Sequence, residues 1–492
     1  MDEAEILRPG MNVHFIGIKG TGTSALAELL LRRGIHISGS DRADVFYTDA
    51  ILKELGIGYN ESFSADHIPP GTDLIIYSAA YSSENNPEMA AAEKLGIPML
   101  KYTDALGAYS ARFDSSGIAG VHGKTTTTAI AGSLIRAASL PAQILAGSAV
   151  AGFGGRSTLY LGDRYFVAET CEYRKHFLAF HPKRIVLTSI ESDHQDYFPT
   201  YESIRDAFME YIRKLPPGGE LIFCADDPGA REAAEGIRRE RPDIRLTPYG
   251  FAAEGPFRIE LLENREERTF LKLEGFPACF KIRVPGRHTA LDAAAALALT
   301  VSLINAEAGK GRAEGGPEQS DVSLEAGQLE ELIGALEDFR GSKRRSEILG
   351  EAGGILFMDD YGHHPTAIRT TLEGLKDFYP RRRLVVSFMS HTYTRTEALL
   401  DQFASAFDAA DAVLLHKIYA SAREEYSGGV RGETLYELMS ESKKTIFYED
   451  EPAEAMDMLK KYLREGDLFL TLGAGDNWVL GKRLYDYYRE NS

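Results

Sequence analysis

The chain has 492 residues, of which 44% are hydrophobic and 26% charged, and its formal net charge is −18. That length suffices for two to four domains, and the negative charge argues against non-specific binding to nucleic acid or anionic membranes, because both need clustered positive charge. Three well-separated cysteines suit a reducing compartment and exclude a zinc site of the C-x-x-C type. The N-terminus lacks the basic and apolar regions of a signal peptide. We therefore expect a cytoplasmic protein whose partners are small molecules, with neither nucleic acid nor a membrane among them.

The first part of the chain alternates between short apolar runs and helical patterns. Residues 13–18, 35–41 and 73–80 have the character of buried strands, and residues 24–34 have helical spacing. This alternation predicts a parallel, doubly wound sheet. The turn after the first strand has the glycine order G-x-x-G-x-G, and Asp41 lies near the distance expected for a ribose partner. Such a turn can bind the diphosphate of NAD or of another ligand, or it can be a purely structural tight turn.

A second strand–loop–helix unit covers residues 115–138. It contains Gly123-Lys124-Thr125 like a phosphate-binding loop, but Ile118 stands where the full G-x-x-x-x-G-K-[ST] motif needs its first glycine. Gly120 is the nearest usable glycine and gives the shortened motif G-x-x-G-K-T. Backbone N–H groups at such a turn hold phosphate oxygens, the lysine adds positive charge, and the threonine can ligate Mg²⁺. Because an apolar run precedes the loop and an Ala-rich helix follows it, we expect a nucleotide-phosphate site and not a plain surface turn.

Polar residues follow further predicted strands at 164–170, 184–190 and 220–227. Glu169 ends the first, and with Thr125 it would be a normal Mg²⁺ ligand around ATP, because Mg²⁺ prefers oxygen. His194 comes after the second strand. Spacing alone favours a capping or core histidine there over a metal ligand.

Three more polar groups occupy the rest of the chain. His288 and Asp292 lie four residues apart on one predicted helix, where an acidic first-turn residue can simply stabilise the helix. Residues 343–345 are a basic run of a kind that is usually solvated. Strands predicted at 354–364, 382–390 and 411–419 end where α/β domains place their sites. At or just beyond these strand ends lie Asp359, Asp360, Tyr361, His363, His364, His391, Arg395 and Arg423.

In order, these elements predict three consecutive α/β domains. They are a Rossmann-like domain at 1–112, a P-loop domain at 113–340, and a second Rossmann-like domain at 341–492. The polar, Gly- and Glu-rich segment at about 305–327 is expected to be a surface insertion. The apolar run 290–306 carries an aspartate and is expected to be a buried helix, not a membrane span.

The whole set resembles the Mur ligases, ATP-dependent enzymes that build the peptide of bacterial cell-wall precursors. GVHGKTTTT, ESDH, PGRHTALDAAAA, GSKRRSEILG, DDYGHHPT and LTLGAGDNW match that family in order from one end of the chain to the other. HFIGIKGTGTSALAELL, GHHPT, HTYTRT and YASARE are closest to its members that add the first amino acid. The resemblance implies that the first glycine loop holds the diphosphate of UDP-N-acetylmuramate, while the shortened P-loop holds ATP.

The activity that the resemblance implies is the joining of L-alanine to the carboxylate of UDP-N-acetylmuramate through an acyl phosphate, with ATP and Mg²⁺. The nearest rival is the recycling reaction that attaches the whole L-Ala-γ-D-Glu-diamino acid tripeptide to the same sugar; HTYTRT and YASARE favour the single amino acid. A nicotinamide-dependent oxidoreductase would leave Lys124 unexplained. A regulatory protein without catalysis would leave the polar strand ends unexplained. Monomer and homodimer both stay open.

The resemblance also implies a role for each matching residue. The ATP-binding residues would be Gly120, Val121, His122, Gly123, Lys124, Thr125, Thr126, His288, Asp292, Arg345 and Asp360. The UDP-sugar-binding residues would be Gly17, Gly20, Thr21, Gly22, Ser40, Asp41 and Ser78. The metal ligands would be Thr125, Glu169 and His194, and the amino-acid pocket would contain His363, His391, Arg395 and Arg423. The catalytic residues would be Lys124, Glu169, His194, His363 and Arg345, with His363 or His391 as the base for the alanine amine.

The sequence departs from the family pattern at several positions. Lys19 replaces a usual glycine, so the diphosphate contacts of the first loop can differ. Thr289 and Asp292 replace the usual Asn pair of the adenine helix, and Thr392 removes an arginine from the amino-acid site. ETCEY stands in place of EADES or EADEY. Residues 195–212 contain no lysine, so we expect none of the carbamylation found in several relatives.

Overall fold

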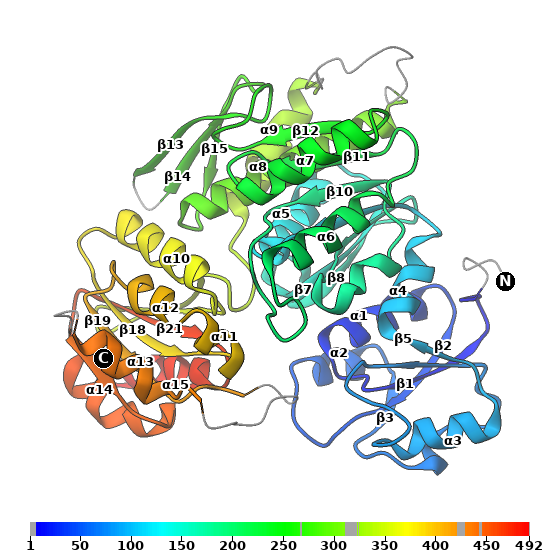
Figure 1. Ribbon diagram of the computed structural model, residues 1–492, viewed down its shortest axis with the longest axis horizontal. Helices are drawn as coiled ribbons and strands as arrows, with labels where there is room; N and C mark the ends of the chain where they lie inside the picture. The colour runs from blue at the N-terminus through cyan, green and yellow to red at the C-terminus, as the bar shows by residue number, and fades with distance from the viewer. Residues whose placement is uncertain are drawn as a thin grey trace. The chain divides into compact units, whose positions relative to one another are not determined.

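The computed structural model describes residues 6–265, 268–309, 322, 324–420, 429–441 and 445–491 (Figure 1). The chain forms two compact units. Unit 1 comprises Met1–Ile190, Arg205–Tyr249 and Ala295–Leu332, and unit 2 comprises Glu191–Ile204, Gly250–Ala294 and Ile333–Ser492. Parallel sheets flanked by helices occur in both units, which confirms the predicted α/β class.

Unit 1 begins with a five-stranded parallel sheet in the order β3-β2-β1-β4-β5. Its strands are β1 (Asn12–Ile16), β2 (His36–Ser40), β3 (Gly58–Asn60), β4 (Leu74–Tyr77) and β5 (Met99–Lys101). Its helices are α1 (Thr21–Arg32), α2 (Thr48–Glu54), α3 (Pro87–Leu95) and α4 (Tyr102–Ser110). The strand order changes direction between β1 and β4, and α/β sheets bind ligands at the carboxyl ends beside such a point.

The second sheet of unit 1 has seven strands in the order β12-β11-β10-β6-β9-β7-β8, and only the β7–β8 pair is antiparallel among its described pairs. Its strands are β6 (Asp114–Ala119), β7 (Ala142–Val150), β8 (Arg156–Tyr160), β9 (Tyr165–Glu169), β10 (Arg184–Leu187), β11 (Glu220–Cys224) and β12 (Arg245–Tyr249). Its helices include α5 (Lys124–Ala137), α6 (Tyr201–Ile212) and α7 (Pro228–Glu240). Small residues in β6 make close packing possible: a Cβ on Gly117 would lie 2.1 Å from the Tyr211 hydroxyl of α6.

Glu28 of α1 joins the two sheets of unit 1. Its side chain is 3% exposed and accepts hydrogen bonds from Arg156 at 2.9 Å and from Thr158 at 2.5 Å, both on β8. Arg32 on the next turn of α1 pairs with the same carboxylate at 2.9 Å. A buried carboxylate is tolerated when it is paired and hydrogen-bonded in this way, and breaking such a pair is costly. The first glycine loop and the second sheet therefore belong to one packed body.

Unit 2 contains a small antiparallel sheet and a larger mixed one. The small sheet comprises β13 (Ile259–Arg265), β14 (Arg268–Leu273) and β15 (Cys279–Ile282). Helix α8 (Arg287–Glu307) supplies residues to both units, and α9 (Ala326–Asp338) follows it. By length and composition α8 alone among the described helices could cross a membrane, but 83% of its most apolar window is buried in protein, as expected for a core helix. Of the predicted insertion, residues 310–321 and 323 lie outside the described residues, and its ends belong to α8 and α9.

The larger sheet of unit 2 has the order β16-β17-β21-β18-β19-β20, with β16 antiparallel to β17 and the other pairs parallel. Its strands are β16 (Glu347–Ala352), β17 (Ile355–Asp360), β18 (Arg383–Met389), β19 (Ala412–Leu415), β20 (Thr445–Tyr448) and β21 (Asp467–Gly473). Its helices are α10 (Pro365–Phe378), α11 (Tyr393–Ala398), α12 (Leu400–Ala406), α13 (Gly432–Ser440), α14 (Met456–Tyr462) and α15 (Asn477–Glu490).

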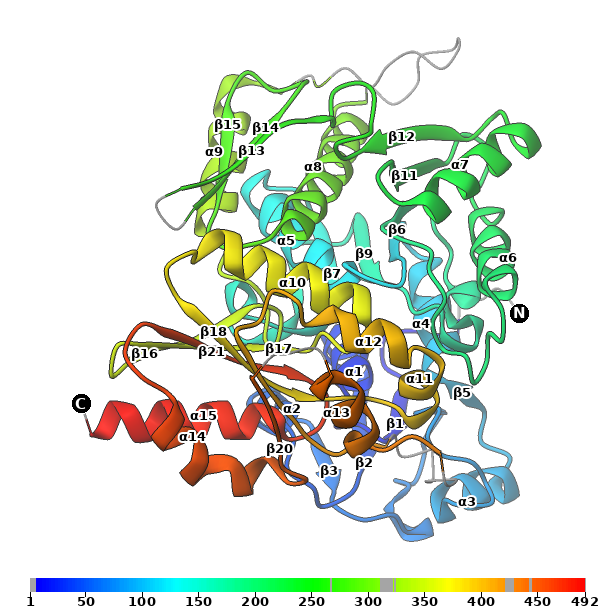
Figure 2. The ribbon, with the colours of Figure 1, turned by 60° about the vertical axis from the view of Figure 1, so that its left-hand side comes forward.

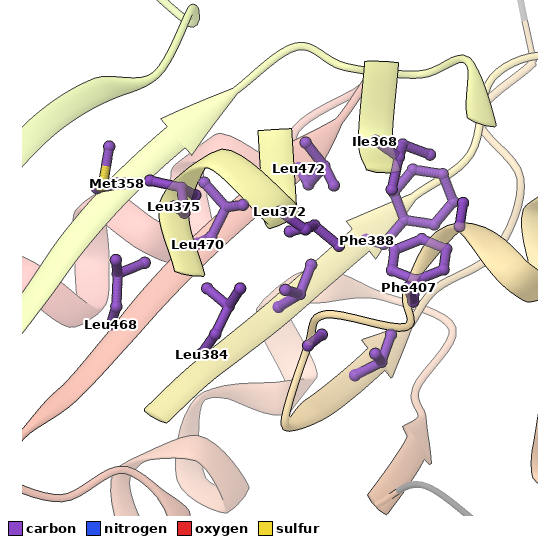
Figure 3. Close-up of a cluster of buried hydrophobic side chains, with 14 of the residues drawn as sticks. Met358, Ile368, Leu372, Leu375, Leu384, Phe388, Phe407, Leu468, Leu470 and Leu472 are labelled. Atoms are coloured by element: carbon purple, nitrogen blue, oxygen red, sulfur yellow. The ribbon is translucent and has the colours of Figure 1, made fainter. Parts of the chain in front are cut away.

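Because side chains alternate between the two faces of these strands, the hydrophobic core of this sheet has two layers, one on each face. Leu356 and Met358 of β17 pack with α10 and α12 on one face, whereas Phe357 packs with α14 and α15 on the other (Figures 2 and 3). Successive side chains of a strand point to opposite faces, so a central strand must be apolar throughout. Truncating a buried leucine such as Leu372 to alanine in such a core costs about 2–5 kcal/mol.

Candidate active site

The first glycine loop connects β1 to α1 at the carboxyl edge of the five-stranded sheet. Gly17 has φ +84°, and a Cβ there would lie 2.8 Å from the Tyr81 ring and 2.9 Å from Ser78 Cβ. Backbone conformation and space both require glycine. The residues predicted to bind the UDP-sugar all follow β1, β2 or β4 at this edge, and they are Gly17, Gly20, Thr21, Gly22, Ser40, Asp41 and Ser78.

Asp41 is the buried acidic residue of this edge. Its Oδ2 accepts a hydrogen bond from the Lys19 N–H at 2.7 Å, and its Oδ1 accepts from the Arg42 N–H at 2.8 Å. The Tyr81 hydroxyl is 3.5 Å from the same Oδ1 and burial, followed by Asp41, raises the pKa of Tyr81 to about 12. A carboxylate has about four lone-pair sites, so Asp41 retains capacity for a ribose hydroxyl.

The shortened P-loop connects β6 to α5. Gly120 has φ +141°, and a Cβ there would lie 2.0 Å from Thr188 Oγ1. Gly123 has φ +79° and caps the N-terminus of α5. The amides of Val121 and His122 donate to Ser189, at 3.1 Å to its carbonyl and 3.0 Å to its hydroxyl. The loop is two residues shorter than the full motif and is hydrogen-bonded to the residues that follow β10. The N-terminus of α5 remains a place where an anion can bind.

Lys124 lies inside this loop and faces an acidic partner. Its Nζ is 2.8 Å from Glu172 Oε2, and the ammonium also donates to the carbonyl of Gly120. Burial alone would lower the pKa of Lys124, but the negative charges of Glu172 and Glu169 raise it above its ordinary value. Lys124 is therefore fully protonated at neutral pH, and Glu172 occupies the position of counter-ion to it.

Thr125 and Glu169 form an oxygen pair at the start of α5. Thr125 Oγ1 donates to Glu169 Oε2 at 2.7 Å, and the Gly147 N–H donates to the same oxygen at 2.9 Å. A Cβ on Gly147 would lie 2.3 Å from this oxygen, so any larger residue would displace the carboxylate from its present position. A hydroxyl and a carboxylate oxygen this close together are the donor set that Mg²⁺ prefers, with its remaining positions filled by water or phosphate. The residues present in unit 1 therefore fit a magnesium ion.

A cavity of about 160 Å³ in unit 1 lies beside the first glycine loop and the Glu169 carboxylate. Gly22 of the first loop and Glu169 both line it, together with Tyr102, Thr103, Leu106, Leu145, Ala146, Gly147, Thr170, Cys171, His176, Phe177 and Phe180. Burial raises the pKa of the Cys171 thiol to about 12, with a further contribution from Glu172. Burial, followed by Glu169, also raises the pKa of Tyr102. Both groups are therefore neutral at pH 7.

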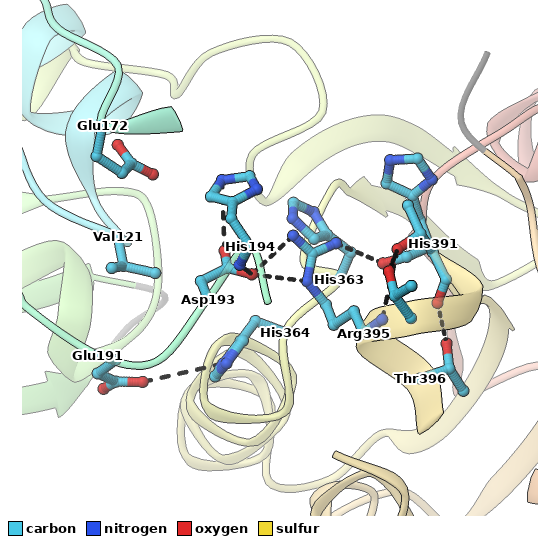
Figure 4. Close-up of polar contacts among 12 residues, drawn as sticks. Val121, Glu172, Glu191, Asp193, His194, His363, His364, His391, Arg395 and Thr396 are labelled. Carbon is cyan, nitrogen blue, oxygen red and sulfur yellow. Dashed lines mark hydrogen bonds and ion pairs between the residues drawn. The ribbon is translucent and has the colours of Figure 1, made fainter. Parts of the chain in front are cut away.

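In unit 2, Arg395 of α11 and Asp193 form a buried ion pair (Figure 4). Nε and one terminal nitrogen of Arg395 lie 2.9 and 2.8 Å from Asp193 Oδ1, and the other terminal nitrogen donates to the His391 carbonyl at 2.5 Å. The pKa of Asp193 lies well below its usual range because the positive charge of Arg395 outweighs burial. The guanidinium predicted for the amino-acid pocket is thus engaged by protein groups.

Three histidines surround this pair (Figure 4). His194 has φ +53°, a left-handed conformation that its own N–H stabilises by donating to Asp193 Oδ1 at 2.7 Å. His363 Nδ1 lies 2.9 Å from the Tyr361 carbonyl, and the rings of His363 and His391 are 6.1 Å apart. Burial, followed by the Arg395 charge, lowers the pKa of His363 well below its ordinary value, so the ring is neutral at pH 7. Unit 2 therefore brings together His194, His363, His391 and Arg395.

The other sites predicted in unit 2 lie on two loops and a helix. Asp360 accepts hydrogen bonds from the Ser346 N–H at 2.6 Å and the Gly362 N–H at 2.7 Å, and Arg345 lies 5.6 Å from the centre of the Tyr361 ring. His288 begins α8 beside Gly286, whose φ of +111° and missing Cβ leave room for the imidazole. Asp292 is buried one turn later. Arg423 lies outside the described residues.

Sequence reasoning missed two partners of these sites. Glu172 holds Lys124, and Tyr81 covers Gly17. Glu172 stands three residues after Glu169 in ETCEY, so a second carboxylate beside a strand end was the available signal. Tyr81 carries no comparable signal, because an aromatic residue after a strand is ordinary.

Family models match the chain in three consecutive segments. Residues 12–114 match the Mur ligase family catalytic domain, 118–300 the Mur ligase middle domain, and 344–475 the Mur ligase glutamate ligase domain. UDP-N-acetylmuramate–L-alanine ligase of Treponema pallidum is 50% identical over 481 residues, which cover 98% of this chain and 97% of that protein. The protein of the same name from Borreliella afzelii is 36% identical, over 95% of this chain and 97% of its own length.

Solved structures agree on the fold. The UDP-N-acetylmuramate–alanine ligase of Thermotoga maritima has a TM-score of 0.76 at 23% identity, covering 98% of this chain and all of that one. A murein peptide ligase of Psychrobacter arcticus has a TM-score of 0.64 at 22% identity, covering 97% of this chain and 98% of that one. Consecutive family matches along nearly the whole length and half-identical relatives lead to one conclusion: the chain belongs to the Mur ligase family.

Proposed function

We propose that this protein is an ATP-dependent ligase that joins L-alanine to the carboxylate of UDP-N-acetylmuramate and releases ADP and phosphate. The observation that carries the proposal is a cavity lined by both Gly22 of the first glycine loop and Glu169, which accepts a hydrogen bond from Thr125 at the start of α5. A sugar whose diphosphate lies at the first loop would place its acyl group in this cavity, beside the Thr125–Glu169 pair. The curated relatives that share the protein's length at 50% and 36% identity carry this ligase name.

The reaction has two displacements. A carboxylate oxygen of the sugar attacks the γ-phosphorus of ATP, and the bond to the β–γ bridging oxygen breaks to give ADP and an acyl phosphate. The alanine amine then attacks the acyl carbon, the amine proton leaves, and inorganic phosphate departs. Such transfers depend on positioning and on neutralising the phosphoryl charge. Lys124, already protonated and buried, would exchange Glu172 for phosphate oxygens and supply that charge.

Magnesium is proposed as the ion that Thr125 and Glu169 hold, where it would neutralise charge on the phosphates. Thr125 Oγ1 and Glu169 Oε2 lie 2.7 Å apart, close enough for one ion to contact both oxygens. His194 is the further ligand that the family resemblance implies. His288, Asp292 and Asp360 would contact the nucleoside, and Arg345 the γ-phosphate.

The amino acid is proposed to bind beside His363 and His391, with Arg423 as a third contact. His363 suits the base because its neutral ring can accept the amine proton at pH 7. Discrimination against glycine rests on one methyl group, worth about 1 kcal/mol.

The tripeptide-recycling ligase is the second candidate, and the names of the curated relatives favour the single amino acid. The proposed location is the cytoplasm, where UDP-sugar and ATP are both present, and the proposed assembly is a monomer or homodimer. Nucleic acid and membrane are not proposed as partners, since the net charge of −18 disfavours both.

The deciding experiment measures phosphate release from ATP and Mg²⁺ with UDP-N-acetylmuramate, adding L-alanine in one arm and the tripeptide in the other. Release that needs both the sugar and alanine supports the proposal. Release with the tripeptide alone would assign the protein to the recycling reaction, and release without the sugar would refute both.

A further inference from the structure

Lys19 stands inside the first glycine loop, yet its ammonium is turned away from solvent. The side chain is 0% exposed, and Nζ lies 2.9 Å from Glu61 Oε1, 3.1 Å from the Asp44 carbonyl and 3.2 Å from Asp49 Oδ1. An ammonium has three N–H donors, and these three oxygens match them. Lys19 therefore has no donor left for a diphosphate.

The backbone of Lys19 contacts the same segment of the chain. Its N–H donates to Asp41 Oδ2 at 2.7 Å, and its carbonyl accepts from Thr48 Oγ1 at 2.5 Å. The backbone of Lys19 thus contacts Asp41 and Thr48, and its side chain contacts Asp44 and Asp49. One residue therefore holds the segment 41–49 at both ends and in its middle.

Residues 42–47 form neither helix nor strand between β2 and α2. Val45 is 93% exposed and Phe46 37% exposed, so little apolar burial holds them. Without the ammonium, Asp49 and Glu61 would face each other with no cation between them, although Tyr59 still donates to Asp49 at 2.9 Å. The contacts of Lys19 are accordingly a principal restraint on this segment.

We propose that Lys19 is a positioning residue of the UDP-sugar site: it fixes residues 41–49, including Asp41, beside the first glycine loop and does not itself bind the diphosphate. The inference rests on the proposed function only in naming the ligand. It also accounts for a lysine at a position where the family usually has glycine, because the ammonium is held by Glu61, Asp49 and the Asp44 carbonyl.

The test compares Lys19→Met with the doubly neutralised variant Asp49→Asn/Glu61→Gln. Both should bind UDP-N-acetylmuramate about tenfold more weakly in calorimetric titration, the size expected for one charge-assisted hydrogen bond. Both should also exchange the amides of residues 41–49 faster, by peptide-resolved hydrogen exchange without ligand. Lys53→Met, which alters an exposed lysine of α2, is the matched control and should behave like wild type.

Two results would overturn the proposal. In the first, Lys19→Met binds the UDP-sugar more weakly but exchanges the amides of residues 41–49 at the wild-type rate, which would show that Lys19 contacts the diphosphate directly. In the second, Asp49→Asn/Glu61→Gln matches wild type in both measurements, which would show that these carboxylates do not restrain the segment. If Lys19→Met does not fold, the double variant still decides. Failure of the wild-type protein to bind the UDP-sugar would refute the proposed function instead, and the ligand-free exchange would still report whether Lys19 anchors the segment.

Discussion

Replacing Lys124 by methionine should damage the protein in two separable ways. The first is catalytic, because the ammonium that would neutralise the transferred phosphoryl group is lost. A group of this kind is worth about 10²–10³ in kcat. The second is structural, because Glu172 is only 3% exposed and its charge would lose its partner.

The size of the structural effect follows from the geometry. At 2.8 Å and an effective dielectric constant of about 20, the attraction is about 6 kcal/mol, and the desolvation of both groups offsets most of it. Removing one partner of a buried pair typically costs about 3–5 kcal/mol, whereas replacing both by neutral groups is often neutral. Lys124→Met should therefore be destabilised by about that amount, and Lys124→Met/Glu172→Gln should regain most of it while remaining inactive.

Hydrogen exchange of β6 and α5 over a urea series measures this local stability, and phosphate release measures turnover. Binding of UDP-N-acetylmuramate to the double variant should match wild type, because its proposed site is the first glycine loop. A Lys124→Met protein as stable as wild type, or a double variant no more stable than the single one, would refute the reasoning about the buried pair. Weak UDP-sugar binding by the double variant would refute the assignment of separate sites.

Three further variants test the rest of the site. Gly147→Ala places a Cβ 2.3 Å from Glu169 Oε2, so phosphate release should fall by about tenfold or more and need more Mg²⁺, whereas Gly334→Ala, whose Cβ meets nothing within 4 Å, should match wild type. Arg395→Met should lower the local free energy of unfolding of α11, measured by hydrogen exchange, by about 3–5 kcal/mol, because it leaves a buried carboxylate unpaired; an unchanged exchange rate would contradict this. His363 has a folded pKa below the ordinary value of 6.5, so its ring should give the NMR signal of neutral histidine throughout the range above pH 6.5, and a titration centred there would count against its proposed role as base.

The central strands could be predicted from sequence because burial on both faces makes them uninterrupted apolar runs. Strands β4 and β19, with the sequences LIIY and AVLL, are of this kind. The antiparallel strands β13 to β15 were not predicted. Their sequences are charged on one face, and β13 exposes most of its residues, so the pattern is too polar to stand out from a loop.

The grouping of candidate residues at sheet edges also follows from sequence, since parallel strands end at a common edge. What each side chain contacts does not follow, because partner choice depends on distances that only packing sets. Lys124 with Glu172, and Arg395 with Asp193, are pairs of this kind. Lys19 illustrates the limit best. The sequence shows that a lysine replaces the usual glycine of the family at this position, but it does not show that the side chain contacts Glu61.

Glu28 has a consequence for substrate choice. By tying α1 to β8 through Arg156 and Thr158, it fixes the separation between the two glycine loops before any ligand arrives. Under the proposed function, the distance from the diphosphate to the reacting carboxylate would therefore be set by the packing of unit 1. We expect a UDP-sugar whose acid group is one bond nearer or farther to bind at its nucleotide end but to react more slowly, because its carboxylate would lie at the wrong point of the cavity.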